Sequence, residues 1–161
     1  MSTDLAESVP LTIHHYLGRT AHLLNLLCKE QEPDQLLGIK LAPDMLDTGL
    51  NFAIAIGFAA RALCPPAGLQ APDIPDEITC TTLQDYQRDI AALIKPIRAT
   101  DLKAPVSHTA GEAELIQDPA EYVTQFALPN MIFHLSMGYA GLRYGGMKIG
   151  KADFDGFHAY A

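Results

Sequence analysis

The sequence predicts an all-α fold, a four-helix bundle with one short β-hairpin before the last helix. Apolar residues recur at helical spacing in four long segments. Alternation typical of a strand is confined to residues 104–117. Prolines and glycines fall at the ends of these segments, and no linker divides the chain. With 161 residues, 48% of them hydrophobic, we expect a single domain over residues 1–161.

The first helix is predicted over residues 9–30. Its apolar face consists of residues at helical spacing: Ile13, Leu17, Thr20, Leu24 and Leu27. His15 and His22 fall on the opposite face, where we expect them to be exposed. The helix should end before Pro33, whose ring disfavours helix in the preceding residue. Residues 34–40 then form a short connection.

The second helix is predicted to begin at Pro43 and Asp44 and to run to Leu63. Proline fits the first helical turn because its missing N–H is not needed there, and aspartate complements the helix dipole. The apolar stripe consists of Met45, Phe52, Ile56, Ala60 and Leu63. Asp47 and Asn51 lie on a different flank, where they are either solvated or turned toward another helix.

A third helix is predicted over residues 81–97, with Pro96 fraying its end. The hairpin follows in residues 104–117, with a turn at Ala110 and Gly111.

The last helix carries the clearest start signal. Asp118 is a suitable N-cap, Pro119 suits the first helical position, and Glu121 is placed for a capping box. The helix should reach Tyr144 with a kink at Pro129, and the tail after it is expected to be extended. It is apolar nearly all round, so one side should face the core. The other side should be covered by the tail or by a second copy of the chain, which predicts a homodimer.

The net charge of the chain argues against some classes of binding partner. The net charge is −8, from 11 Lys and Arg against 19 Asp and Glu. An acidic surface argues against nucleic-acid binding. No apolar run approaches the roughly 20 residues that span a bilayer, so we expect no membrane partner. The acidic N-terminus does not resemble a signal peptide, which predicts a cytoplasmic protein.

The three cysteines, Cys28, Cys64 and Cys80, are widely spaced and form no CxxC pair. This pattern argues against structural zinc and predicts reduced thiols in a reducing compartment.

His134 is the principal candidate for a functional residue. It lies in the apolar stretch Met131–Leu135, and Asn130 precedes it by one helical turn on the same flank. Buried polar groups without partners cost about 1–3 kcal/mol each. The pair is therefore either satisfied by backbone carbonyls freed near Pro129 or part of a ligand or metal site between helices. Asn51 could face His134 from the second helix. No HExxH, GxSxG or phosphate-loop motif is present, so the sequence names no catalytic residue.

Three motifs in order support a family resemblance. Leu41–Met45 reads LAPDM, Phe126–His134 reads FALPNMIFH, and Gly150–Phe154 reads GKADF. Over residues 8–156 the chain resembles an uncharacterised bacterial domain-of-unknown-function family of the DinB/YfiT-like metalloenzyme superfamily. The resemblance implies a four-helix bundle that is often dimeric. Many superfamily members bind a divalent metal through three histidines, and some are thiol transferases.

The resemblance also assigns positions to the site. In the superfamily two metal histidines lie four residues apart on the last helix, and an arginine follows nine residues after the second. Arg143 follows His134 by nine residues, so His134 matches the second histidine and Asn130 the first. Asn51 matches the third. Amide oxygens are poor ligands for zinc or nickel. We therefore expect a degenerate pocket of Asn51, Asn130 and His134 with no metal and no cofactor.

Three functions follow from this pattern. The first is a non-enzymatic bundle that binds a small molecule or a partner in the inherited pocket. The second is a metal-dependent or thiol-transferring enzyme of the superfamily type. The third is a structural dimer in which His134 is only a core residue. The sequence does not identify the ligand and leaves catalytic activity open.

Overall fold

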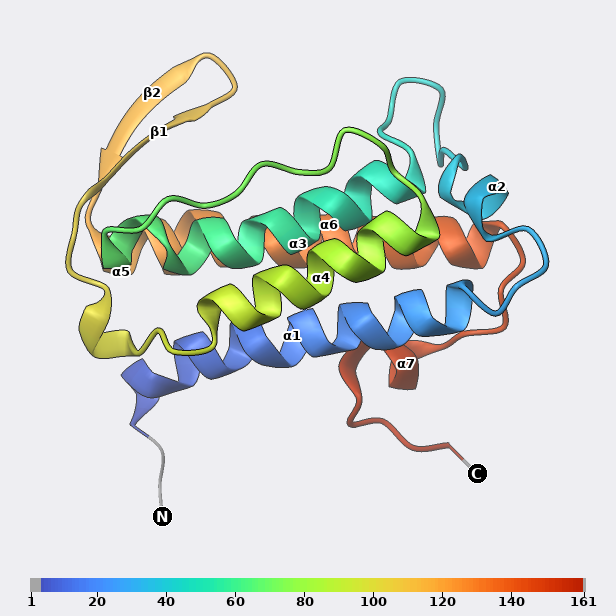
Figure 1. Cartoon of the computed structure of the whole chain (residues 1–161), viewed down its shortest axis with the longest axis horizontal. Helices are drawn as coiled ribbons and strands as arrows, with labels where there is room; N and C mark the ends of the chain where they lie inside the picture. The colour runs from blue at the N-terminus through green and yellow to red at the C-terminus, as the bar shows by residue number, and fades with distance from the viewer. Residues whose placement is uncertain (1–3, 161) are drawn as a thin grey trace.

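The computed structural model describes residues 4–160 of the chain, which are mostly helical with one two-stranded sheet (Figure 1). Among these residues, the long helices are α1 (Leu5–Leu27), α3 (Thr48–Leu63), α4 (Cys80–Ile94) and α6 (Leu128–Tyr144). The short ones are α2 (Pro33–Leu37), α5 (Pro119–Glu121) and α7 (Lys151–Asp155). The strands are β1 (Val106–Ala110) and β2 (Ala113–Gln117).

Helix α3 lies at the centre of the core. All but three of its residues are buried, and it packs most extensively against α6 and then against α4. Small residues on α6 allow the close approach. A methyl group added to Gly138 would lie 3.0 Å from the Phe52 ring, and one added to Gly141 would lie 3.0 Å from Thr48 Cβ. Helices α3 and α6, which carry the candidate site, are therefore closely packed.

The segment Thr48–Ala67, which is α3 and the turn after it, is long and apolar enough to cross a membrane. The prediction that no apolar run approaches this length was wrong. Its apolar 18-residue window is 72% buried within the fold, as expected of a core helix.

The second helix begins later than predicted. Pro43 and Asp44 lie in a turn before α3, and Asp47 is the N-cap, its side chain accepting the Leu50 N–H at 2.7 Å. An aspartate side chain that accepts an N–H three residues on satisfies a donor at the helix start. The first helix begins earlier than predicted, at Leu5, and ends at Leu27. Helix α4 ends at Ile94, before Pro96.

The predicted hairpin is confirmed, with β1 and β2 antiparallel and Val106 opposite Gln117. The predicted last helix is continuous from Pro119 to Tyr144, but residues Tyr122–Ala127 form a π-helical segment. The Leu128 N–H there bonds to the Val123 carbonyl, five residues back. This wider turn comes directly before Pro129, which has no N–H to continue the helical ladder.

The tail is not extended as predicted, because residues 151–155 form α7 against α1. The Gly150 N–H donates to the Asp153 side chain at 2.9 Å, and Gly156 ends the helix with φ of 75°. The GKADF motif thus forms the start of α7, whereas LAPDM lies in the turns before α3.

The prediction of reduced thiols was wrong for two of the three cysteines. Cys28, after α1, and Cys80, which begins α4, form a disulfide with their Cα atoms 5.9 Å apart. Cys64 is free and buried. Burial raises the pKa of the Cys64 thiol, which makes it a poor nucleophile.

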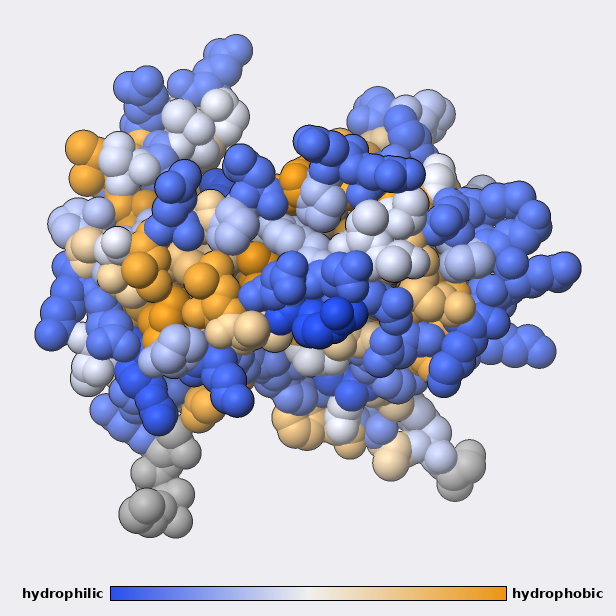
Figure 2. Space-filling view, in the orientation of Figure 1, coloured by the Kyte–Doolittle hydropathy of each residue, from blue (hydrophilic) through white to orange (hydrophobic). Residues whose placement is uncertain are grey.

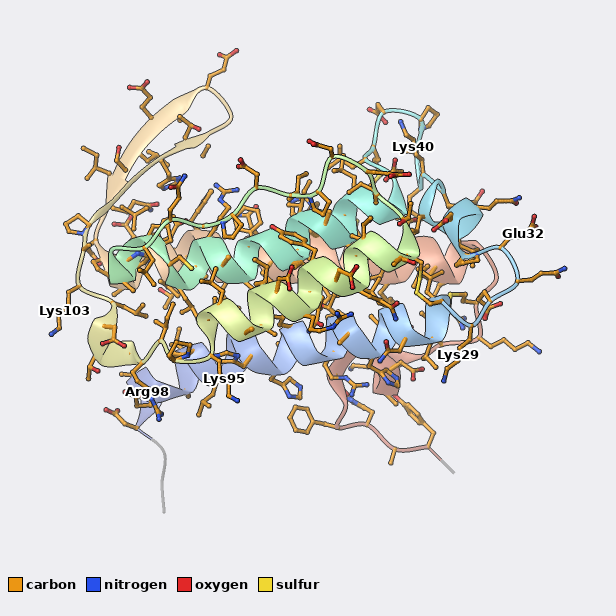
Figure 3. The ribbon with its side chains drawn as sticks, in the orientation of Figure 1. Lys29, Glu32, Lys40, Lys95, Arg98 and Lys103 are labelled. Atoms are coloured by element: carbon orange, nitrogen blue, oxygen red, sulfur yellow. A yellow bond between two sulfur atoms is a disulfide. The ribbon has the colours of Figure 1, made fainter. Side chains whose placement is uncertain are left out.

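The surface in the view of Figure 2 is hydrophilic over most of its area, with an apolar patch at the left end. Labelled charged residues lie at both ends of the molecule in Figure 3, with Lys95, Arg98 and Lys103 at the left and Lys29 and Lys40 at the right. The five labelled basic side chains are thus divided between the two ends.

Candidate functional site

Asn51 lies in the first turns of α3 with 4% of its surface exposed. Its Nδ2 group donates to two backbone carbonyls, Leu46 at 3.2 Å and Asp47 at 2.9 Å. Both amide hydrogens are used by these bonds. The orientation of the amide is therefore fixed, and its Oδ1 atom faces α6.

His134 on α6 meets that oxygen. Its Nδ1 atom lies 2.9 Å from Asn51 Oδ1. An amide oxygen only accepts, so Nδ1 carries the proton and donates it. The second ring nitrogen, Nε2, then holds a free lone pair. Burial lowers the pKa of His134 below its ordinary value, because the charged imidazolium is poorly solvated there. The side chain is thus a neutral imidazole of defined tautomer at pH 7.

Asn130 lies one turn before His134 but does not join this pair. Its Nδ2 group donates to the Phe126 carbonyl at 2.7 Å, at the end of the π-helical segment. This is the arrangement expected of a polar side chain satisfied by backbone near Pro129. The structure therefore brings two of the three candidate residues, Asn51 and His134, into contact, and the third bonds to its own helix.

Two aromatic rings lie beside the imidazole. Phe58 of α3 stacks on it with ring centroids 6.0 Å apart and an interplanar angle of 12°. Phe133 meets it edge-on at 5.1 Å, and 54% of the Phe133 surface is exposed. The environment combines one basic nitrogen with apolar ring surface.

The donor set does not fit the metal that the superfamily resemblance implies. Within residues 4–160, no three His, Cys, Asp or Glu side chains are grouped to hold an ion. Asn51 Oδ1 already accepts from His134, and the Asn130 amide donates to Phe126. One imidazole nitrogen remains, whereas catalytic zinc uses three protein ligands. These residues therefore do not form a three-ligand metal centre of the superfamily type.

Two histidines that were predicted to be exposed instead hold the tail. His15 Nε2 donates to the Asp155 carbonyl at 2.7 Å, and its ring stacks on Phe157 at 4.8 Å. His22 Nε2 lies 2.9 Å from Asp153 Oδ1. The partners are more than 130 residues away in sequence, so helical spacing alone could not reveal them.

Sequence reasoning also missed Arg61, in the last turn of α3. Its guanidinium carbon lies 4.3 Å from the centroid of the Phe58 ring. Tyr122 donates its hydroxyl to the Arg61 carbonyl at 2.8 Å. The signal available was that Arg61 is the single charged residue of α3.

His108 on β1 was another unassigned histidine. Its Nε2 donates to Gln117 Oε1 at 2.7 Å, and its ring packs on Phe126 at 4.3 Å. Its Nδ1 atom is buried and has no hydrogen-bond partner among the described residues. The hairpin is thereby fastened to the helix that carries His134.

Comparisons with known proteins agree with this fold. A crystal structure of a DinB family member protein from Shewanella denitrificans has a TM-score of 0.73 at 20% identity and covers 98% of this chain and 99% of its own. No curated protein matches the chain. The family described as "Domain of unknown function (DUF1993)" matches residues 7–155, which is most of the chain. The protein belongs to the DUF1993 family and has the fold of a DinB family member.

Proposed function

We propose that the chain is a DinB/YfiT-like four-helix bundle that binds a small molecule through Nε2 of His134, without a tightly held metal. The single observation that carries the proposal is the hydrogen bond from His134 Nδ1 to Asn51 Oδ1. It leaves Nε2 as a lone-pair acceptor held in one orientation by a buried amide. Nε2 is the part of the ring that the bond to Asn51 leaves available for a ligand.

The chemistry of the surroundings suggests the kind of ligand. A neutral imidazole nitrogen accepts an N–H or O–H. The rings of Phe58 and Phe133 offer apolar contact beside it. A ligand with one hydrogen-bond donor next to an apolar or aromatic group satisfies both features. Asn51 orients the imidazole and does not itself contact the ligand, and Asn130 lies at the edge of the proposed site.

The alternative is a metal-dependent or thiol-transferring enzyme. It requires His134 to bind an ion with water or unassigned groups completing the shell. Elemental analysis of the untagged protein and of His134→Ala separates the two. We expect no stoichiometric metal in either protein. A metal present in the wild type and lost in the variant would contradict our proposal and support the enzyme.

A positive test uses nuclear magnetic resonance of the histidine ring nitrogens. The wild type should show His134 as the neutral tautomer protonated at Nδ1. A screen with imidazole, phenol and indole as probes should shift the His134 Nε2 resonance. His15→Ala is the matched control, because it removes an imidazole that bonds to α7. Failure of every probe to shift Nε2, or shifts independent of His134, would overturn the small-molecule proposal.

We also propose a homodimer through the outward face of α6. Phe133 and Tyr144 on this helix are 54% and 74% exposed. Burial of such rings against a second copy would be favourable by about 25 cal/mol per Å² of apolar surface. Light scattering at micromolar concentration should report a dimer, and Phe133→Ser should weaken it. A monomer at that concentration would contradict this proposal.

A further inference from the structure

A groove lies on α3, on the side that faces the loop before α4. It has a volume of about 350 Å³. Three of its lining residues come from α3 and three from the loop: Ile54, Gly57, Arg61, Pro72, Asp73 and Ile74. This loop leads from the end of α3 back along the helix to the start of α4 (Figure 1). The His134 site does not include any of these side chains.

The cationic wall of the groove is Arg61. Its guanidinium lies over the Phe58 ring, and within residues 4–160 no carboxylate oxygen lies within ion-pair distance of it. The aromatic contact holds the guanidinium in place without neutralising its charge. A planar guanidinium held in this way can form two parallel hydrogen bonds to a carboxylate.

A buried hydroxyl lies behind the groove. Tyr86 of α4 is 7% exposed, and its hydroxyl lies 3.5 Å from the Pro72 carbonyl, well beyond the usual 2.7–2.8 Å of such a bond. The Tyr86 hydroxyl would be 3.2 Å from a methyl group placed on Gly57, which locates it at the groove. Burial raises the pKa of Tyr86 to about 12, so the hydroxyl stays protonated and able to donate.

The anionic wall is Asp73, an exposed side chain on the loop. It is close enough to Tyr86 to raise the pKa of that hydroxyl, while Arg61 acts on the same group in the opposite direction. Asp73 and Arg61 nevertheless do not form an ion pair with each other. Two separated opposite charges, with Ile54, Pro72 and Ile74 beside them, match a small molecule that has both charges and an aliphatic group.

We infer that this groove binds a small zwitterion of the aliphatic α-amino-acid class. Arg61 and the Tyr86 hydroxyl receive the carboxylate, Asp73 receives the ammonium group, and Ile54 and Ile74 contact the aliphatic side chain. The inference goes beyond the function proposed for His134 and does not depend on it.

The test is a titration of the full chain with L-leucine, followed by backbone amide resonances. L-leucine should shift residues 54–61 and 72–74 and leave the His134 ring nitrogens unchanged. Two probes separate the charges: 4-methylpentanoate has only the carboxylate, and 3-methylbutylamine has only the ammonium. Each should bind at least about tenfold more weakly than L-leucine.

Single substitutions test the role proposed for each side chain of the groove. Arg61→Gln should weaken L-leucine binding at least about tenfold, because one charge-assisted interaction is lost. Asp73→Asn should weaken L-leucine to a similar extent but leave 4-methylpentanoate unchanged. Tyr86→Phe keeps the buried ring and should weaken the binding of both L-leucine and 4-methylpentanoate. Arg88→Gln is the control, since that arginine is exposed and pairs with Asp85 on α4.

Three outcomes would overturn the inference. The first is the absence of shifts in residues 54–61 at about 10 mM L-leucine, a concentration that detects even weak binding. The second is equal affinity for L-leucine and 4-methylpentanoate, which would remove Asp73 from the site. The third is unchanged affinity in folded Arg61→Gln and Tyr86→Phe proteins.

Discussion

Histidines take part in two different interhelical contacts in this fold. Comparing them shows how the residue bonded to each histidine determines what that histidine does. At the α3–α6 contact, His134 bonds to the neutral amide of Asn51. At the α1–α7 contact, His22 bonds to the carboxylate of Asp153, with side chains 37% and 30% exposed. The first pair is enclosed by two long helices, and the second fastens a five-residue helix to the surface.

The difference is electrostatic. An amide partner adds no charge, so burial alone governs His134 and lowers its pKa. The contact with His22 holds the pKa of the Asp153 carboxyl below its usual range. We therefore regard the α3–α6 pair as an oriented acceptor and the α1–α7 pair as a clamp on the tail.

The largest effect is expected where the two long helices are closest. Gly141→Ala would place a methyl group against the Thr48 side chain, 3.0 Å from its Cβ atom. Overpacking of this kind should lower the free energy of unfolding by about 3 kcal/mol. Gly18→Ala on α1 is the control, because nothing lies within 4 Å of its new Cβ. It should raise stability by about 0.5–1 kcal/mol, as measured by urea unfolding. Equal effects of the two substitutions would contradict the close α3–α6 contact.

The next effect concerns the amide that orients His134. Asn51→Ala leaves the His134 Nδ1–H and the Leu46 carbonyl without partners, whereas the Asp47 carbonyl keeps its bond from the backbone N–H of residue 51. The substitution should cost about 2 kcal/mol of unfolding free energy. The ring-nitrogen spectrum should also lose its single tautomer. Asn25→Ala is the matched control, since Asn25 is exposed and accepts only from Gln84. A single retained tautomer in Asn51→Ala would show that the amide does not set the orientation.

A smaller effect on stability should follow from protonation of the buried histidines. The pKa values of His134 and His14 are lowered by burial in the folded state. The unfolded chain therefore binds more protons near its own pKa of about 6.5. The stabilising contribution is present above that pH and is lost as pH falls through the lowered folded values. His134→Gln should flatten this loss in urea unfolding between about pH 7.5 and 5. An unchanged pH profile would assign the loss to other groups.

The smallest effect should come from the tail. Asp153→Asn weakens the partly exposed pair with His22 and should cost no more than about 1 kcal/mol of unfolding free energy. Hydrogen exchange should accelerate in α7 and stay unchanged in α3 and α6. The folded pKa of Asp153 is lowered, and that of Asp155 is lowered to about 2. Their contribution is therefore present above about pH 3.8 and is lost as pH falls below it. Loss of protection in α3 would contradict a local role for the clamp.

Local patterns were enough to predict most of the helical elements. The spacing of apolar residues located four long helices, and Asp118 marked the start of the last one. Alternation with the turn at Gly111 identified the hairpin, which is confirmed. The start of α3 was misplaced because Pro43 and Asp44 suit a first helical turn, whereas Asp47 is the N-cap, as the accepted Leu50 N–H shows.

Long-range contacts could not be predicted in the same way. The Cys28–Cys80 pairing spans 52 residues, and helix packing alone brings the two side chains together. Residue spacing left open whether Asn51 faces solvent or His134, and the family resemblance placed both residues in one site. The direction of Asn130 depends on the π-helical segment, for which the sequence offers no signal beyond Pro129. The role of the three residues as a ligand site stays a prediction.

The disulfide between Cys28 and Cys80 also decides how the chain responds to tension. It joins the end of α1 to the start of α4, so α2 and α3 lie inside a covalent loop. A force applied to the two termini passes through the sulfur atoms and leaves that loop unstretched. The 52-residue separation shortens the fully extended chain by roughly 180 Å, at about 3.5 Å per residue. Single-molecule pulling before and after reduction would register this as a step in contour length, with the helix that carries Asn51 extending only once the bond is cut.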